Sequence, residues 1–247
     1  MHPLMSRLLT GAALGAAVGA TAVADDHCDI APYLVNGALM TGGLTHNGVA
    51  TAPTISVYGF EFGEDAADPY NPSDPGVNQT AGTGNLPAGA ALRYNLLGSL
   101  LYWDGTGDVA WNAPTDTITL LCGANSRTLT GTSGAQAGSL IQSVAADGSL
   151  HKHFTTSLYA AGATVNVPGE PEYVAPTTGI YAFQMELTLT PMTGTYTSNA
   201  FWLVFNNGMS EEVHDAAMTA LATVPEPTAL ALLAAATAGL LHRRRRQ

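Results

Sequence analysis

Basic side chains are scarce in this chain of 247 residues. Lys and Arg number 8 against 19 Asp and Glu, for a net charge of −11. Residues 25–223 hold three of the 8 basic side chains and 18 of the 19 acidic ones, so this part alone has a net charge of −15. A surface of that charge repels nucleic acids and other anionic polymers, unless a cation bridges them. Nucleic acid is therefore excluded as a partner.

The short motifs of common enzyme classes are also missing. The sequence has no Gly-x-Ser-x-Gly elbow, phosphate-binding loop, His-Glu-x-x-His or dinucleotide fingerprint. The two carboxylates that cleave a glycosidic bond are brought together by the fold and need not be close in the sequence. Glu61 and Glu186 therefore stay candidates for glycoside cleavage. Trp103, Trp111 and Trp202 could stack on sugars, although Trp202 lies in an apolar run typical of a core strand. We expect no catalysis, with a carbohydrate- or metal-binding module as the first alternative and a polysaccharide-active enzyme as the second.

Most of residues 25–223 consists of short β-favouring runs separated by Gly, Pro, Asn and Asp. Apolar and polar residues alternate over 54–62 and most clearly over 180–190, which predicts strands with one buried face. The further strands that we expect are 90–97, 99–103, 117–122, 127–130, 139–145, 150–159 and 200–205. Residues 63–86 are rich in proline and acids and predict a long loop, of the kind that is usually functional or disordered.

A single helix is expected over 211–223, with Ser210 as N-cap and Glu211 and Glu212 in its first turn. No repeat of fixed period is present, which argues against a propeller or a solenoid. The elements together predict an all-β fold, an antiparallel, jelly-roll-like β-sandwich with one short C-terminal helix. Residues 25–223 would form this domain.

His151 and His153 are the most suggestive histidines. Positions i and i+2 of a strand face the same way, so both imidazoles would project to one side and could bind one transition metal ion such as zinc. His214 would supply a further ligand if the predicted helix packs over that strand. The alternative is a pair of solvent-facing histidines on an exposed sheet face.

Acidic side chains suggest a second kind of ion site. Asp65, Asp68 and Asp74 lie in the predicted long loop, and Asp104 and Asp108 lie in a glycine-rich turn. Carboxylates on flexible loops suit calcium, but the spacing of an EF-hand loop is absent. Solvated acidic loops without an ion are the alternative.

The two ends of the chain read as targeting segments. Residues 1–24 combine Arg7, an apolar stretch and the small-x-small site Ala22-Val23-Ala24, which predicts a cleaved signal peptide. Residues 224–247 begin with Val224, Pro225, Glu226 and Pro227, continue with the uncharged, alanine- and leucine-rich run 228–241, and end with the basic block Arg243, Arg244, Arg245, Arg246. A helix of 14 residues spans about 21 Å, which is short for a hydrocarbon core of about 30 Å. The arginines would keep the C-terminus on the cytoplasmic side.

This ending resembles the PEP-CTERM sorting signal of exported bacterial proteins, through Val224-Pro225-Glu226-Pro227, the apolar segment and Arg243–Arg246. The resemblance implies that an exosortase and the secretion machinery handle the chain and that the tail is an inner-membrane anchor until it is cut. It also implies a final place at the cell surface or in the extracellular matrix, with extracellular polysaccharide as a candidate partner.

Cysteine is rare, and Cys28 and Cys122 both lie in the part expected to be exported. An oxidising compartment permits a disulfide between them, which would join the start of the domain to a central strand. Two buried thiols are the alternative.

Overall fold

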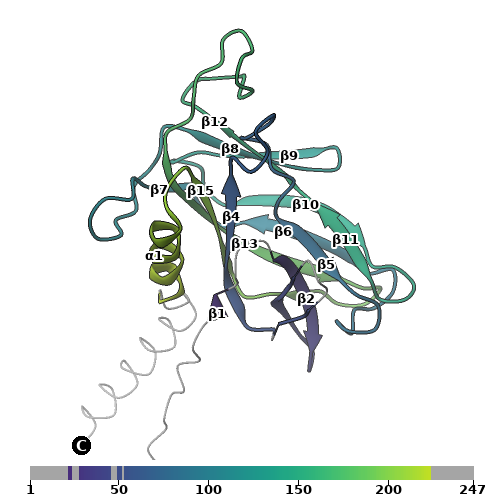
Figure 1. The fold of residues 1–247 in the computed structure, drawn as a ribbon. Helices are drawn as coiled ribbons and strands as arrows, with labels where there is room; N and C mark the ends of the chain where they lie inside the picture. The colour runs from purple at the N-terminus through teal and green to yellow at the C-terminus, as the bar shows by residue number, and fades with distance from the viewer. Residues whose placement is uncertain (1–21, 24–27, 46–48, 52, 224–247) are drawn as a thin grey trace, which may run out of the picture.

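The computed structural model describes residues 22–23, 28–45, 49–51 and 53–223 (Figure 1). These residues form short strands followed by one helix. In chain order the elements are β1 (Ala22–Val23), β2 (Asp29–Val35), β3 (Ala38–Leu44), β4 (Ile55–Phe62), β5 (Gly76–Gln79), β6 (Ala91–Leu96), β7 (Leu101–Trp103), β8 (Thr117–Cys122), β9 (Asn125–Leu129), β10 (Gln136–Ser143), β11 (Leu150–His153), β12 (Thr155–Tyr159), β13 (Gly179–Thr190), β14 (Tyr196–Thr197), β15 (Phe201–Asn207) and α1 (Glu211–Ala222).

The strands are arranged in three sheets. The largest has eight strands in the order β1-β4-β15-β13-β6-β10, with β7 and β14 also paired to β13. A four-stranded sheet has the order β11-β5-β2-β3, and a three-stranded sheet has the order β12-β8-β9. Most neighbours are antiparallel, but β4 pairs with β15 in parallel, as β1 does with β4 and β2 with β5. The predicted all-β class with one C-terminal helix is confirmed, and its purely antiparallel pairing is replaced by mixed sheets.

The main core lies between the large sheet and the two smaller ones. It contains side chains from all three sheets, including Phe183 and Phe205 of the large sheet, Ile30 of β2 and Leu120 of β8. The ring of Phe205 stacks on those of Phe60, Phe62 and Phe183 at centroid distances of 5.1, 5.3 and 5.8 Å. Aromatic pairs of this kind stabilise a core beyond the area they bury. Residues far apart in the sequence thus share one apolar interior.

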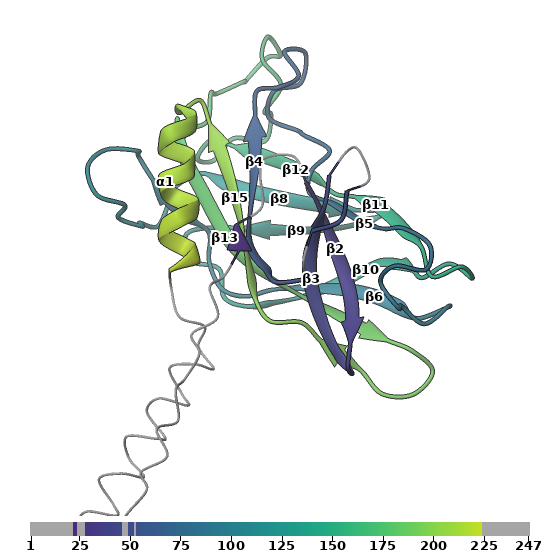
Figure 2. The same cartoon turned by 60° about the horizontal axis from the view of Figure 1, so that its bottom comes forward.

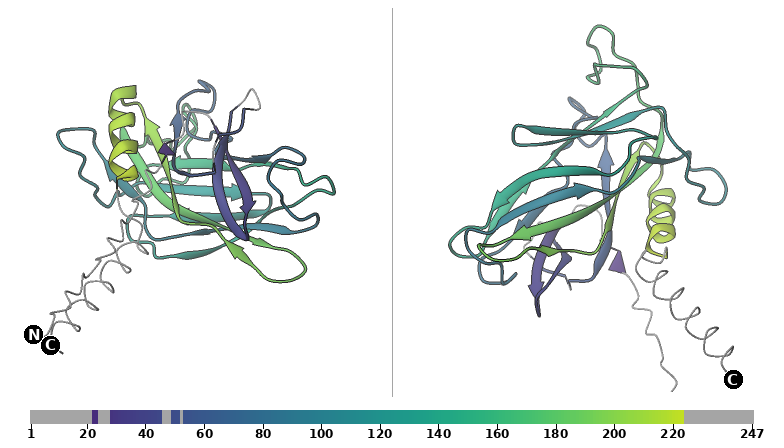
Figure 3. Two further views of the ribbon diagram at one scale, coloured as in Figure 1. Left: turned by 90° about the horizontal axis from the view of Figure 1, so that it is seen from below. Right: turned by 180° about the vertical axis from the view of Figure 1, so that it is seen from behind.

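A second, smaller core lies under α1, on the opposite face of the large sheet. Its members include Ala217, Met218 and Leu221 of α1 and Val57 and Val204 of the sheet. The helix runs along β15 and β4, away from the β2–β3 hairpin (Figure 2), and two further views agree (Figure 3). The helix, the large sheet and the two smaller sheets therefore form three layers.

Several predicted elements are confirmed nearly residue for residue. The strand expected at 117–122 is β8, the one at 180–190 is β13, and the helix expected at 211–223 is α1. Along β13, Tyr181, Phe183, Met185, Leu187 and Leu189 all enter the main core, as the alternation indicates. Periodicity thus predicted β13 and α1 correctly, and apolar composition predicted β8 correctly.

Other elements differ from the prediction where the chain changes sheet. The single strand expected at 150–159 is two strands, β11 and β12, which meet at the buried Phe154 and belong to different sheets. β11 pairs with β5 and β12 with β8, so the chain changes its partner at Phe154, whose nitrogen donates to the carbonyl oxygen of Pro75, 3.0 Å away. The expected loop 63–86 contains β5, a short strand between β11 and β2. The strand β2, which contains Pro32, was not predicted.

The expected disulfide is not formed in this structure. Cys28 and Cys122 are both buried and are not bonded to each other. Cys122 lies in β8, where its sulfur is 3.8 Å from the carbonyl oxygen of Leu140. Burial raises the pKa of the Cys122 thiol. The alternative of two buried thiols is the one that the structure shows.

The targeting segments fall almost entirely outside the described residues. Of the predicted signal peptide, only Ala22 and Val23 are described, as the two-residue strand β1 beside β4. The sorting tail 224–247 is not described. In the part of the chain that is described, no helix has the length and apolar character needed to cross a membrane.

Candidate functional site

Three potential metal ligands meet on the outer face of the four-stranded sheet. Asp29 begins β2, and His151 and His153 lie on β11, with β5 between these two strands. One ligand atom from each of the three residues lies within 4.8 Å of the other two. Among the described residues this is the group of three or more His, Cys, Asp or Glu that comes close enough to hold an ion.

The two histidines are held side by side by the strand pairing. His151 pairs with Asn78 and His153 with Gly76 on β5, while Leu150 and Phe154 point into the core beneath them. The two Nε2 atoms are 2.8 Å apart, and the ring centroids are 4.9 Å apart. The expectation that both imidazoles project to one side is therefore correct. Both rings are partly open to solvent.

Asp74 lies beside this pair rather than in a cluster of loop carboxylates. Its Oδ1 is 4.0 Å from Nδ1 of His153, and both side chains are partly exposed. The residue before it, Ser73, has its carbonyl oxygen 2.7 Å from the same Nδ1. The turn that leads into β5 thus contributes polar groups behind His153.

His214 does not join the pair. It is fully buried under α1, and α1 and β11 lie on opposite sides of the molecule (Figure 1). Its Nδ1 is 3.5 Å from Oε1 of Glu61, and its Nε2 is 3.3 Å from the carbonyl oxygen of Val204. The prediction of His214 as a third ligand is wrong because the helix packs on the far face of the large sheet. Asp29 takes that place, and no local pattern in the sequence indicates it.

The other acids proposed for calcium make local turns. Asp65 accepts from the nitrogen of Ala67 at 2.8 Å, and Asp68 accepts from Nδ2 of Asn71. Asp104 accepts from the nitrogen and the hydroxyl of Thr106 at 3.0 and 2.8 Å, and these bonds lower the pKa of its carboxyl. Asp108 is exposed. The structure does not gather these side chains into one ligand set, so the calcium prediction gains no support from it.

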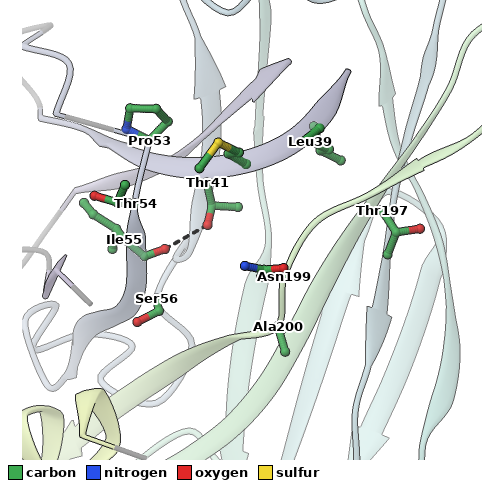
Figure 4. A pocket seen from close by; sticks show the side chains of 11 residues that line it. Leu39, Thr41, Pro53, Thr54, Ile55, Ser56, Thr197, Asn199 and Ala200 are labelled. Carbon is green, nitrogen blue, oxygen red and sulfur yellow. Dashed lines mark hydrogen bonds between the residues drawn. The ribbon is translucent and has the colours of Figure 1, made fainter. Parts of the chain in front are cut away.

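The two glutamates considered for glycoside cleavage each bind an asparagine. Glu186 accepts from Nδ2 of Asn95 at 2.9 Å, and Glu61 accepts from Nδ2 of Asn206 at 2.9 Å. A surface pocket lies elsewhere, between β3, the start of β4 and the chain before β15, where the Thr41 hydroxyl donates to the carbonyl oxygen of Ile55 at 2.8 Å (Figure 4). The residues that line it, none of them acidic or basic, are Ala38, Leu39, Met40, Thr41, Pro53, Thr54, Ile55, Ser56, Thr197, Asn199 and Ala200.

Comparison with known families assigns the end of the chain. Residues 223–246 match the family model of the PEP-CTERM protein-sorting motif. Searches of curated proteins and of solved structures found no match to this chain. The match confirms the predicted sorting tail, and it indicates an exported protein that an exosortase processes and that has a C-terminal anchor before processing.

Proposed function

Because residues 223–246 form a PEP-CTERM sorting motif, we propose that this chain is an exosortase-sorted protein of the cell surface or extracellular matrix. Its β body acts there without catalysis. The single observation that carries the proposal is the motif at the end of the chain. The structure adds how closely body and motif are joined, because α1 ends at Ala222 and the motif begins at the next residue.

The packing of α1 supports the body as the sorted cargo. The helix buries His214, Ala217, Met218 and Leu221 against the large sheet, so the residue before the motif belongs to a firmly packed element. An exosortase that engages the motif would therefore meet a folded domain directly beside it.

Two features of the body support a non-catalytic role. The surface pocket is lined by side chains without acid–base character, and the two glutamates on strands are each engaged by an asparagine. General acid–base chemistry requires a titratable group at the place where the substrate is bound. A carbohydrate-binding module remains the alternative, and a glycan array with the purified chain distinguishes it from a structural protein.

The test is to follow the tail in a bacterial host that encodes an exosortase. We expect the wild-type protein recovered from the cell surface or medium to lack Arg243–Arg246 by mass. A variant with Pro225→Ala and Pro227→Ala should stay with the membrane and keep its arginines. The matched control is Pro168→Ala, which also removes a proline but lies in the body. An intact tail on all extracellular protein, or the same distribution for the tail variant and wild type, would contradict the proposal.

A further inference from the structure

We propose that Asp29, His151 and His153 form a binding site for a divalent transition metal ion of the zinc type. The site lies in the body and does not depend on how the chain is sorted. Two imidazole nitrogens and one carboxylate oxygen are donors that zinc accepts at about 2.0–2.2 Å. Ligand atoms that already lie within 4.8 Å of one another can reach such distances around one ion by small side-chain rotations. The further argument rests on three features of the surrounding residues.

The first feature is a gap that lets Asp29 reach the histidines. The strand β5 separates β2 from β11, so a side chain on β5 would stand between the carboxylate and the imidazoles. The residue at that point is Gly76. A Cβ added there would lie 1.8 Å from Oδ1 of Asp29 and 2.9 Å from Cε1 of His153. Gly76 has no need of a left-handed backbone, so the space it leaves for Asp29 is the consequence of its missing side chain.

The second feature sets the tautomer of His153. The carbonyl oxygen of Ser73 lies 2.7 Å from Nδ1 of His153 and can only accept a hydrogen bond. Nδ1 of the neutral ring therefore carries the proton, and Nε2 has a lone pair directed toward His151. A backbone carbonyl behind a metal-binding histidine is the usual arrangement, because it fixes the tautomer and raises the basicity of the ligand.

The third feature orients the carboxylate. Nδ2 of Asn78 donates to Oδ2 of Asp29 at 2.9 Å, and this asparagine is the cross-strand neighbour of His151. The bond holds one carboxylate oxygen and leaves Oδ1, the atom nearest the Gly76 gap, for an ion. His153 and Asp29 thus each have a supporting group, the carbonyl of Ser73 for the first and the side-chain amide of Asn78 for the second.

The metal-free state is also defined by this geometry. With a lone pair on Nε2 of His153, the 2.8 Å contact requires His151 to donate from its own Nε2. Metal binding moves that proton to Nδ1 of His151, so that both Nε2 lone pairs face the ion and no proton is lost from the ring. The hard ions calcium and magnesium bind oxygen rather than imidazole nitrogen, so the donor set favours zinc and its neighbours.

Titration calorimetry of the untagged full chain in detergent with zinc chloride tests the site. We expect one ion per chain, and a loss of affinity of more than about 100-fold in His151→Ala, because even supporting residues are worth about 10–100-fold. Gly76→Ala keeps all three ligands but fills the gap, and it should also weaken binding by about 10-fold or more. Asn78→Ala should lower the affinity for zinc by about 10–100-fold, as the loss of a supporting residue does. Asp108→Asn is the matched control and should bind as the wild type does.

A second measurement separates a lost site from a lost fold. Thermal unfolding without zinc should be the same for His151→Ala and wild type, because this side chain is exposed, while zinc should raise the midpoint of the wild type alone. Nitrogen shifts of the His151 ring should report Nε2–H without metal and Nδ1–H with zinc. The proposal is overturned if the wild type takes up no zinc, or if His151→Ala and Gly76→Ala both bind it with wild-type affinity.

Discussion

Replacement of the buried Asp116 should detach both ends of the segment between β12 and β13 at once. Asp116 is 3 % exposed and precedes β8. Its Oδ1 accepts from the nitrogen of Ala161 at 3.1 Å, and its Oδ2 accepts from the nitrogen of Thr177 at 2.7 Å and from the hydroxyl of Tyr181 at 2.7 Å. Ala161 and Thr177 lie at the two ends of this segment, which projects at the top of Figure 1. The carboxylate of Asp116 therefore holds the two ends of this segment together.

The size of the effect follows from the donors that lose their acceptor. In Asp116→Ala the Tyr181 hydroxyl can still donate to the carbonyl oxygen of Thr177, which is also 2.7 Å away. The two backbone N–H groups belong to exposed residues and their hydrogen bonds are part-buried, so water can reach them in the variant, and each lost bond to the carboxylate costs about 1–3 kcal/mol net of hydration. We expect a loss of about 2–6 kcal/mol in the free energy of unfolding. In Asp116→Asn one carbonyl oxygen remains, so the loss should be about half as large.

Urea unfolding of the metal-free chain, followed by circular dichroism, measures these values. The matched control is Asp147→Ala, because Asp147 accepts from the nitrogen of Ser149 in the same manner but at the surface. Surface replacements usually change stability by less than about 0.5 kcal/mol. A loss below about 1 kcal/mol for Asp116→Ala, or an equal loss for the alanine and asparagine variants, would refute the reasoning.

Two further predictions concern protons. Burial, followed by the nearby Asp116, raises the pKa of Tyr181 above its usual value of 10.0. Above pH 10 the unfolded chain loses this proton while the folded chain keeps it, so the free energy of unfolding should fall as the pH rises. Urea unfolding at pH 9–11 should show a smaller fall of this free energy for Tyr181→Phe than for the wild type. The Cys122 thiol has a raised pKa and is 1 % exposed, so it should resist alkylation at pH 8 until urea is added. Mass spectrometry would count the labelled thiols, and fast labelling of the native chain, or no labelling after unfolding, would contradict this expectation.

The sequence predicted what depends on local pattern. The alternation of β13 and the amphipathic pattern of α1 are properties of consecutive residues, and both elements form where expected, although the Ser210 side chain makes no capping hydrogen bond. The His151–His153 pair is local in the same sense, because the two-residue period of a strand places both rings on one face. The sorting tail was equally readable, since its parts follow one another in the chain.

The pairing of strands that are distant in the chain could not be predicted from local sequence patterns. Asp29 meets the histidines only because β5 places β2 beside β11, and the role of Gly76 appears only when its neighbours are known. Whether His214 faced the pair depended on which side of the large sheet α1 covers, which its amphipathic pattern does not specify. The β11–β12 break at Phe154 likewise depends on a change of sheet partner rather than on a turn signal.

The parallel contact between β4 and β15 has a consequence for the order of folding. Glu61 and Asn206 touch across this contact although 145 residues separate them in the chain. The large sheet cannot be completed until β15 enters between β4 and β13, and closing so long a loop slows folding because its entropy is lost before the contact forms. A chain whose synthesis has not reached β15 would therefore contain β4 and β13 without the strand that joins them in the large sheet. We expect the body to reach its native state only after nearly all of it has been synthesised, which leaves the preceding part open to export as an unfolded chain.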